Sequence, residues 1–376
     1  MNILFIPSWY PNSENETNGI FFKEQAHALL KNNVNIFILS LNTYYFRNIF
    51  NYLKLKKKID FYNDNGIKTY IINYLNIFPR FKYLFFIYSS LKLKHYYQYI
   101  IDENSIKFDL IHIHSIFNAG IFYYLSKIPI NYIITEHVTF FSRNMLSFLD
   151  KYFVKKVLLS AKRIISVGNG LKDELSKYTD KNIDIIYNMV SLNKSNCKLD
   201  LNKKYFRFFS LGEGLYKKGF DILVTAFKNS NICDKAELII AGLTEKEIKK
   251  LKKMFKVNNI KLLGIITREE VSFNFYNCDC FVLPSRFETF GVVFAEAMYF
   301  GKPVIASVTG GPDSFITPET GMLVPVNNTY ETMLAMENMY LKFSNYDNNH
   351  IMEYANSQFS ENIISNKIIK IYQDAV

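Results

Sequence analysis

Residues 284–302 read PSRFETFGVVFAEAMYFGK, and this stretch decides the fold prediction. An apolar, strand-like run reaches Pro284, a loop follows, and an apolar helical pattern then runs to Gly301, a typical residue for ending a helix. Two acidic side chains, Glu288 and Glu296, interrupt the apolar pattern with seven residues between them. The pattern predicts that Glu288 lies in the loop at the carboxyl end of the strand and that Glu296 faces out from the early helix.

The start of this predicted helix suits an anion. Backbone N–H groups near Phe290, Gly291 and Val292 have no partner inside the helix, and the helix dipole adds to their attraction for phosphate. Gly291 also lets a ligand approach the backbone closely. Carboxylates accept hydrogen bonds from hydroxyl groups. Glu288 and Glu296, on either side of an anion site, therefore indicate a ligand with hydroxyls on both sides of its phosphates, as in a nucleotide sugar.

Strand-like and helical segments alternate along the whole chain. The β-rich runs are 2–6, 34–41, 108–114, 131–137, 163–168 and 183–188, and then FRFFSLG, AELIIAG, IKLLG, CFVLPS, PVIAS and MLVPV. This rhythm is typical of parallel sheets covered by helices on both faces. A polar stretch at 191–204 separates the two sets. We therefore predict an α/β protein with two Rossmann-like, doubly wound parallel-sheet domains facing a cleft, residues 1–190 and 205–355, with a helix at about 358–376 packing back on the first.

The composition is that of a globular protein. The chain has 376 residues, 49% of them hydrophobic and 21% charged, and this length favours two domains over one. The opening stretch lacks the basic start, apolar run and cleavage site of a signal peptide. The apolar runs are much shorter than the roughly 20 residues that span a bilayer. The four cysteines form neither a disulfide framework nor a paired zinc pattern, as expected in a reducing cytoplasm.

Positive charge is concentrated in the first half. Residues 1–190 carry 23 Lys or Arg and 14 Asp or Glu, a net +9 of the total +11. The segment 44–97 alone holds ten basic, two acidic and seventeen Phe or Tyr residues. Such a surface suits nucleic acid or an anionic membrane, or it is a solvated lysine face over a Phe-rich core. No zinc-finger spacing or RNA-binding aromatic motif supports nucleic acid. We predict contact with an anionic membrane through 44–97, and no nucleic acid.

The motif region closely resembles a known family. PSRFETFGVVFAEAMYFGKPVIASVTGGPDSFI is similar to the region with two glutamates seven residues apart in retaining glycosyltransferases of the GT-B fold, in family 4, also called glycosyl transferases group 1. SWYPNSENETNGIFFKEQAHAL, TEH, IISVGNGLKDEL and SLGEGLYKKGFDILVTAF resemble further parts of that family. The resemblance covers nearly the whole chain except about 44–100. It implies a GT-B enzyme that moves a sugar from a nucleotide-sugar donor, UDP- or GDP-linked.

The resemblance also implies roles for single residues in donor binding. Glu296 would hold the donor ribose, Glu288 would act at a hydroxyl of the donor sugar, and backbone at 290–292 would receive sugar and phosphate oxygens. Lys218, in KKGFD, would pair with the diphosphate, and Gly19 lies in a loop that approaches donor phosphate. One departure concerns Glu213, because such families usually carry an arginine five residues before the motif lysine. Lys218 would then carry that charge with help from Lys217 or Arg286.

Three histidines lie near predicted strand ends. His137, with Glu288, matches the catalytic residues of the family, at the donor sugar or the acceptor. His114 ends a parallel strand at the same edge and is an acceptor-side candidate. His112, two residues earlier, is predicted to point opposite to His114 and to belong to the core. A structural role for His137 remains the alternative to the catalytic one.

The predicted reaction is hexosyl or N-acetylhexosaminyl transfer with retention of configuration. No two aspartates are separated by one residue, so the DxD metal motif of the other major transferase fold is absent and we predict an enzyme that needs no metal or other cofactor. The acceptor is predicted to be a glycan, lipid-linked or free, for capsule, O-antigen or lipooligosaccharide, extended at the inner face of a bacterial cytoplasmic membrane. The alternatives are a GT-B enzyme that uses no acceptor, such as an epimerase, and a catalytically silent sugar-binding partner protein.

Overall fold

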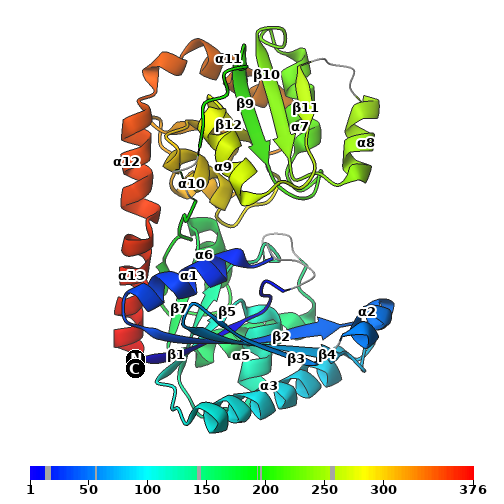
Figure 1. The fold of residues 1–376 in the computed structure, drawn as a ribbon, viewed down its shortest axis with the longest axis vertical. Coiled ribbons are helices and arrows are strands. Elements are labelled where there is room, and N and C mark those ends of the chain that lie inside the picture. The colour runs from blue at the N-terminus through cyan, green and yellow to red at the C-terminus, as the bar shows by residue number, and fades with distance from the viewer. Residues whose placement is uncertain (13–17, 56, 142–144, 193, 195–196, 255–258) are drawn as a thin grey trace. The chain divides into compact units, whose positions relative to one another are not determined.

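The computed structural model describes residues 1–12, 18–55, 57–141, 145–192, 194, 197–254 and 259–376. These residues form two compact units. The N unit comprises Met1–Val167, Leu171–Met189 and Glu361–Val376, and the C unit comprises Gly168–Gly170 and Val190–Ser360. Each unit contains one sheet with its own helices (Figure 1).

The N unit is built on an eight-stranded sheet with the order β3-β4-β2-β1-β5-β6-β7-β8. Its strands are β1 (Asn2–Pro7), β2 (Asn35–Tyr44), β3 (Ile59–Asp64), β4 (Ile67–Leu75), β5 (Leu110–His114), β6 (Tyr132–Glu136), β7 (Arg163–Ser166) and β8 (Ile183–Ile185). All neighbours pair in parallel except β3 with β4. The central strands are almost wholly buried, as expected for a parallel sheet that helices cover on both faces.

The helices of the N unit follow the parallel strands. They are α1 (Ile20–Lys31), α2 (Ile49–Lys54), α3 (Lys82–Asn104), α4 (Ile121–Ser126), α5 (Phe148–Ser160), α6 (Asn169–Ser176), whose first two residues belong to the C unit, and α13 (Glu361–Ala375). In Figure 1, α1 covers one face of the sheet and α3 and α5 cover the other. The last helix, α13, buries Ile364, Ile368 and Tyr372 in the same apolar cluster as Phe22 and Leu29 of α1. The final residues of the chain thus complete the core of the N unit.

The segment 44–97 contains structure that the sequence reading did not resolve. It forms the end of β2, α2, the antiparallel hairpin β3–β4 and most of α3. Asn65 (φ 49°) and Gly66 (φ 101°) make the hairpin turn, and an Asn-Gly pair between β-rich runs is a strong hairpin signal. Tyr70 and Tyr74 of β4 are buried, whereas Phe50 of α2 is 74% exposed. The aromatic residues therefore serve both the core and the surface.

The C unit has a six-stranded, all-parallel sheet with the order β11-β10-β9-β12-β13-β14. Its strands are β9 (Phe206–Leu211), β10 (Ala236–Ala241), β11 (Ile260–Leu262), β12 (Cys280–Leu283), β13 (Val304–Ser307) and β14 (Gly321–Val324). Its helices are α7 (Phe220–Asn229), α8 (Glu245–Met254), α9 (Arg268–Asn277), α10 (Val292–Tyr299), α11 (Thr329–Leu341) and α12 (Asn348–Phe359). The six predicted strands of this half are confirmed. All carboxyl ends of these strands lie at one edge of the sheet, where ligands bind in open α/β folds.

Candidate functional site

The loop between β12 and α10 is fixed by an aromatic anchor. Phe290 is 1% exposed, and its ring lies 5.0 Å from the ring of Phe315 and 5.6 Å from that of Phe359. The next residue, Gly291, caps α10 in the left-handed conformation (φ 83°), and a Cβ there would lie 2.6 Å from the Phe294 ring. Only glycine fits this position without strain. The anchored loop therefore holds the first amides of α10, from Val292 onward, at the carboxyl edge of the sheet.

Glu288 lies in this loop, as predicted, and is held by a cation. The Nζ of Lys218 makes an ion pair and hydrogen bond with Glu288 Oε1, and the hydroxyl of Ser285 donates to the same oxygen at 3.1 Å. The two charged side chains are only 13% and 9% exposed. Lys218 comes from the turn before α7 and Glu288 from the loop after β12, so two neighbouring strands of the sheet bring them together.

Glu296 corrects one expectation. It does not face outward, because it is 3% exposed, and its Oε1 accepts a hydrogen bond from Arg268 Nη1 at 2.8 Å. The outward direction was predicted from the apolar pattern of α10 alone. That pattern does not contain Arg268, the first residue of α9, which pairs with the buried carboxylate. A carboxylate is tolerated in a buried position when a cation pairs with it. Each glutamate of the motif thus has its own cation, Lys218 for Glu288 and Arg268 for Glu296.

Arg286 was expected to help Lys218 pair with the diphosphate, but the contacts of its guanidinium group argue against this role. Its guanidinium makes a bidentate ion pair with Asp221, with both distances 2.8 Å, and its Nε donates to Asn327 at 2.6 Å. This pair raises the pKa of Arg286 and holds the pKa of Asp221 below its ordinary value against the effect of burial. Such planar, bidentate pairs are strong. Glu213, where the family has arginine, is exposed.

The N unit holds a second polar cluster, at the ends of β5 and β6. Glu136 is fully buried and receives four hydrogen bonds: from Ser115 Oγ at 2.5 Å, and from the amides of Ile116 (2.8 Å), His137 (2.6 Å) and Val138 (2.9 Å). Burial raises the pKa of Glu136, and these hydrogen bonds oppose the rise. Glu136, which the sequence reading did not single out, therefore fixes the backbone on both sides of His137.

The three histidines stand in one row. His112 and His114 have ring centroids 4.1 Å apart, so the prediction that they point to opposite faces is wrong. Residues two apart in a strand share a face. His112 is a core residue, as predicted, because its ring nitrogens bond to Tyr372 Oη at 2.7 Å and Thr135 Oγ1 at 2.8 Å. His114 Nδ1 lies 3.4 Å from His137 Nε2. His114 therefore links the buried ring of His112 to His137, the predicted catalytic histidine.

These histidines are neutral near pH 7. Burial lowers the pKa of His137 to about 3 and the pKa values of His112 and His114 well below their ordinary value. The ring of His137 packs against Phe21 at 5.2 Å and Phe22 at 5.0 Å. A neutral imidazole in this environment donates or accepts a hydrogen bond without adding charge. His137 can therefore bind a sugar hydroxyl.

Gly19 begins α1 in the left-handed conformation (φ 80°). A Cβ at this position would lie 2.9 Å from Trp9 Cδ1, so glycine is required both for the backbone angle and for the approach of Trp9. Gly19, His114 and His137 lie in the N unit, and Lys218, Glu288, 290–292 and Glu296 lie in the C unit.

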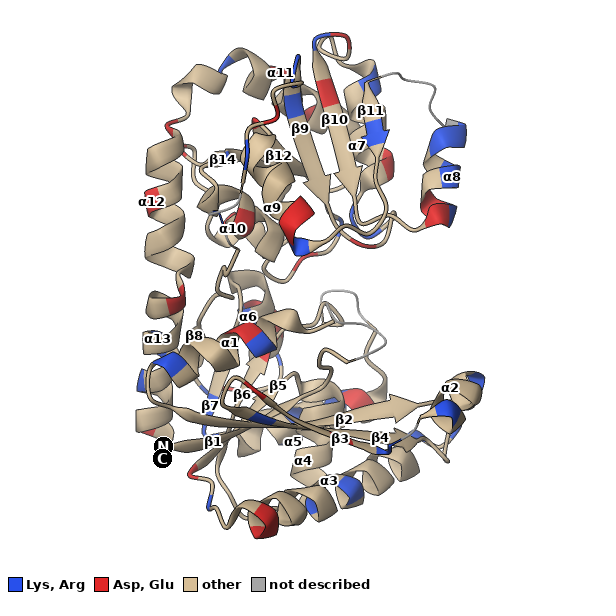
Figure 2. Cartoon of the chain, viewed as in Figure 1, with Lys and Arg blue, Asp and Glu red and all other residues tan. Residues whose placement is uncertain are grey.

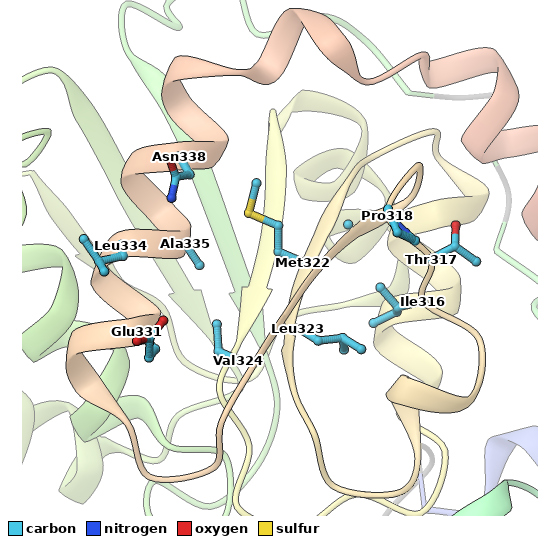
Figure 3. A pocket seen from close by; sticks show the side chains of 11 residues that line it. Ile316, Thr317, Pro318, Met322, Leu323, Val324, Glu331, Leu334, Ala335 and Asn338 are labelled. Atoms are coloured by element: carbon cyan, nitrogen blue, oxygen red, sulfur yellow. The ribbon is translucent and has the colours of Figure 1, made fainter.

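A cavity elsewhere in the C unit is separate from these groups. It has a volume of about 440 Å³ and lies between β14 and α11, lined by residues that include Met322, Leu334 and Asn338 (Figure 3). It shares no lining residue with the motif loop. Within the described ranges, no cluster of three or more His, Cys, Asp or Glu residues has a geometry for holding a metal ion.

Two α/β units with parallel sheets, and a pair of cation-bound glutamates at the carboxyl edge of the second sheet, define a GT-B glycosyltransferase. The chain matches the family "Glycosyltransferase Family 4" over residues 21–194 and "Glycosyl transferases group 1" over residues 193–350. The protein belongs to this family of glycosyltransferases.

Relatives of known sequence and structure agree with this assignment. An uncharacterized glycosyltransferase of Methanocaldococcus jannaschii is 30% identical over 273 residues, which cover 72% of this chain and 74% of that protein. The O-antigen chain mannosyltransferase C of Escherichia coli is 24% identical over 298 residues, or 75% and 78% of the two chains. The crystal structure of Anabaena HepE in complex with UDP and glucose matches the fold over 100% of both chains, with a TM-score of 0.70 and 15% identity.

Proposed function

We propose that this glycosyltransferase moves a hexosyl or N-acetylhexosaminyl group from a UDP- or GDP-linked donor to a glycan acceptor in the synthesis of a bacterial surface polysaccharide. The observation that carries the proposal is the pair Glu288–Lys218 at the carboxyl edge of the C-unit sheet, beside the amino end of α10. Carboxylate, ammonium and backbone amides together suit a ligand that carries both hydroxyls and a diphosphate. The O-antigen mannosyltransferase among the relatives supports a polysaccharide product.

Each group has a role in this proposal. Glu296 holds the donor ribose, and Arg268 keeps its carboxylate oriented. The amides at 290–292 and Lys218 receive the diphosphate, and Glu288 and His137 bind hydroxyls of the transferred sugar. The cation and the amides stabilise the negative charge that develops on the leaving nucleoside diphosphate. Such electrostatic stabilisation accounts for a large part of the lowering of the activation barrier by enzymes.

The proposed transfer retains the configuration of the sugar and uses no metal. Attack on the same face as the departing phosphate lets that phosphate take the acceptor proton. We expect product with the donor's anomeric configuration by NMR and full activity in EDTA. A metal requirement in well-folded protein would contradict the second expectation.

The transferase reaction is tested by acceptor dependence. Purified protein with its nucleotide sugar should release nucleoside diphosphate much faster when a glycan acceptor is added, and Glu288→Ala and Glu296→Ala should abolish the increase. An epimerase would convert the sugar at the same rate without acceptor. A sugar-binding partner protein would release no diphosphate under either condition.

The ion pair Glu288–Lys218 makes a distinctive prediction. Lys218 is held by Glu288, so a diphosphate must compete with that carboxylate for the ammonium group. Glu288→Gln removes the competitor, and UDP or GDP should then bind about tenfold more tightly by calorimetry, since about 1.4 kcal/mol of pairing no longer opposes binding. Transfer should fall, because the variant loses a charged partner for the donor sugar. Weaker binding of the nucleotide would contradict this assignment of Lys218.

The N unit carries the surface that we propose to contact an anionic membrane. Phe50 and Leu53 of α2 are 74% and 65% exposed and lie three residues apart, so they share one helix face. Lys54, Lys57 and Lys58 lie beside them and are exposed, while Lys56 is outside the described residues. Figure 2 shows the Lys and Arg positions, in blue, on α2 and along α3. Aromatic residues at the headgroup level with lysines reaching phosphates suit an anionic lipid surface.

Liposome flotation tests this surface. Replacement of Lys54, Lys56, Lys57 and Lys58 by Gln should weaken binding to phosphatidylglycerol-containing vesicles at least about tenfold, since each lysine near an anionic surface contributes about 1 kcal/mol. The matched control is replacement of the exposed Lys249, Lys250, Lys252 and Lys253 by Gln, because these are four of the five lysines of α8, a helix that has no aromatic residue. Equal losses in the two variants would show a nonspecific charge effect. No helix among the described residues is long and apolar enough to cross a bilayer.

A further inference from the structure

The cavity of about 440 Å³ in the C unit lies along the open edge of a sheet. β14 is the last strand in the order of its sheet, and among the described strands it pairs with β13 alone. All four residues of β14 line the cavity, between one face of α11 and residues 316–318. An open strand edge presents backbone N–H and C=O groups that can pair with another chain. The cavity is therefore a groove over an edge that can accept a further strand.

The backbone bonds of β14 show which groups face this groove. The carbonyl oxygens of Thr320 and Val324 accept hydrogen bonds from the amides of Val304 at 3.1 Å and Val308 at 3.0 Å. These two residues of the β14 segment thus direct their carbonyls toward β13. Backbone groups alternate in direction along a parallel strand, so the N–H and C=O of Leu323 point away from β13 and toward the groove.

The open edge of β14 is short. Gly321 shares the direction of Leu323, but its amide donates to the carbonyl of Thr317 at 3.0 Å, which leaves its carbonyl for the edge. Pro325 follows the strand and has no N–H to offer. The edge therefore presents the N–H of Leu323 and the C=O groups of Gly321 and Leu323. Few backbone bonds are possible here, so the side chains of a bound segment must supply the selectivity.

Different walls lie on the two sides of β14 (Figure 3). Met322 and Val324 lie on the side of α11, near Leu334, and Leu323 lies on the other side, near Ile316. Leu323 is 40% exposed, which is unusual for a leucine within a parallel sheet. Successive side chains of a strand point to opposite sides. Alternate side chains of a segment bound to this edge would therefore meet one wall or the other.

The α11 wall carries the charge of the groove. Glu331 is the one charged residue among the described lining residues. It is exposed, and its carboxylate has no hydrogen bond or ion pair with any described residue. Residues 303–341 contain four acidic and no basic side chains, in a chain of net charge +11. This local charge attracts a basic segment and repels an acidic one, and the stem of a lysine packs well on apolar groups such as Leu334.

We propose that this groove binds an extended, basic segment of a partner protein, which adds a short strand to the edge of β14. Basic side chains on one face of the segment reach Glu331, and apolar side chains on its other face pack on Ile316 and Leu323. The surface is independent of the proposed transferase function, because the groove shares no lining residue with the motif loop.

Fluorescence anisotropy with labelled hexapeptides tests the proposal. The first probe alternates valine and lysine, and the second alternates valine and glutamate. We expect the valine-lysine peptide to bind the wild type saturably and the valine-glutamate peptide to bind much more weakly. Glu331→Lys should raise the dissociation constant of the valine-lysine peptide about tenfold, because an attraction becomes a repulsion.

Backbone methylation separates strand addition from attraction between charges. One derivative of the valine-lysine peptide is N-methylated at every valine and the other at every lysine. Alternate N–H groups of a bound strand face its neighbour, so one derivative should bind at least about fivefold more weakly, the effect of one hydrogen bond. The other derivative should bind nearly as well as the parent peptide. Both measurements use the wild-type protein, so they do not depend on the folding of a variant.

Leu323→Pro removes the N–H of the open edge. Proline is tolerated on an edge strand where the N–H faces outward, so the melting temperature should change little. The valine-lysine peptide should bind this variant at least about fivefold more weakly.

The matched control for Glu331→Lys is Glu245→Lys. Both residues are exposed glutamates in the first turn of a helix, α11 and α8, so the two changes have the same effect on the helix dipole. Glu245→Lys should leave peptide binding unchanged. Neither variant should alter sugar transfer, so loss of peptide binding would leave the proposed transferase function intact.

Other occupants of the groove give different results. Sedimentation velocity without peptide tests for a second copy of this chain: a wild-type dimer that Leu323→Pro converts to a monomer would overturn the assignment to a partner protein. Equal binding of the glutamate peptide, or an unchanged affinity in Glu331→Lys, would overturn the basic character of the segment. Equal affinities of the two methylated derivatives would overturn strand addition, and a lack of binding by every peptide would overturn the site.

Discussion

Lys218→Met should lower kcat/KM for sugar transfer about 1,000-fold. Lys218 is the cation that we assign to the diphosphate, and Arg286 does not replace it because Asp221 holds its guanidinium. Loss of one preorganised electrostatic partner of the developing charge costs about 10²–10³ in rate. No second cation compensates at position 213, because this chain has Glu213 where the family usually carries an arginine. Methionine keeps the aliphatic stem, so packing changes little. Steady-state kinetics with a nucleotide sugar and acceptor measure the effect.

The control for Lys218→Met is Lys228→Met. Lys228 is exposed in the last turn of α7, so the same chemical change there should leave kcat/KM within about twofold. Lys218→Arg should recover part of the rate, because it restores the charge but not the compact ammonium geometry. Transfer by Lys218→Met within threefold of the wild type would remove Lys218 from the mechanism.

The N unit should lose stability steeply below pH 6.5. The pKa values of His112, His114 and His137 are lowered in the folded state by burial, so the unfolded chain binds protons that the folded chain does not. The free energy of unfolding is not reduced by these histidines above pH 6.5, the approximate pKa of histidine in the unfolded chain. It falls as the pH drops below that value. At pH 5 the lowered pKa of His137 costs about 2 kcal/mol, and the lowered pKa values of His112 and His114 add to this loss in the same direction.

Denaturant unfolding at a series of pH values measures this loss. The raised pKa of Glu136 acts in the opposite direction, because the folded state then takes up a proton before the unfolded state does, and it offsets at most one histidine. His112→Gln should make the loss of stability between pH 6 and pH 5 less steep, because one histidine fewer takes up a proton on unfolding. His95→Gln, on the exposed surface of α3, controls for the loss of a histidine. An unchanged slope in His112→Gln would show that His112 is not buried as a neutral ring.

The sequence predicted best what local patterns encode. The strand, loop and helix around Glu288 and the six strands of the C unit follow from apolar runs bounded by glycine and proline, and family resemblance added the GT-B fold. The environment of Glu296 was not predictable in this way, because its partner Arg268 lies 28 residues earlier and on another helix. Contacts between elements distant in sequence require the tertiary structure.

Two further failures have different causes. The same-face arrangement of His112 and His114 follows from the two-residue period of a strand, so the sequence pattern was sufficient to predict it. The hairpin β3–β4 was not predicted, because the aromatic and basic residues of its segment were interpreted as a surface. Asn65-Gly66 nevertheless marked its turn.

Calorimetric titration with UDP-, GDP- and ADP-sugars tests most directly whether the C unit is a nucleotide-sugar site built on the two glutamates. The wild type should bind a UDP- or GDP-sugar with one site per chain. Glu296→Ala should weaken that binding about 30-fold, because a charged acceptor of ribose hydroxyls is lost, while Glu245→Ala, on the exposed start of α8, should not. The absence of binding by every nucleotide sugar, or equal affinity in Glu296→Ala, would contradict the account.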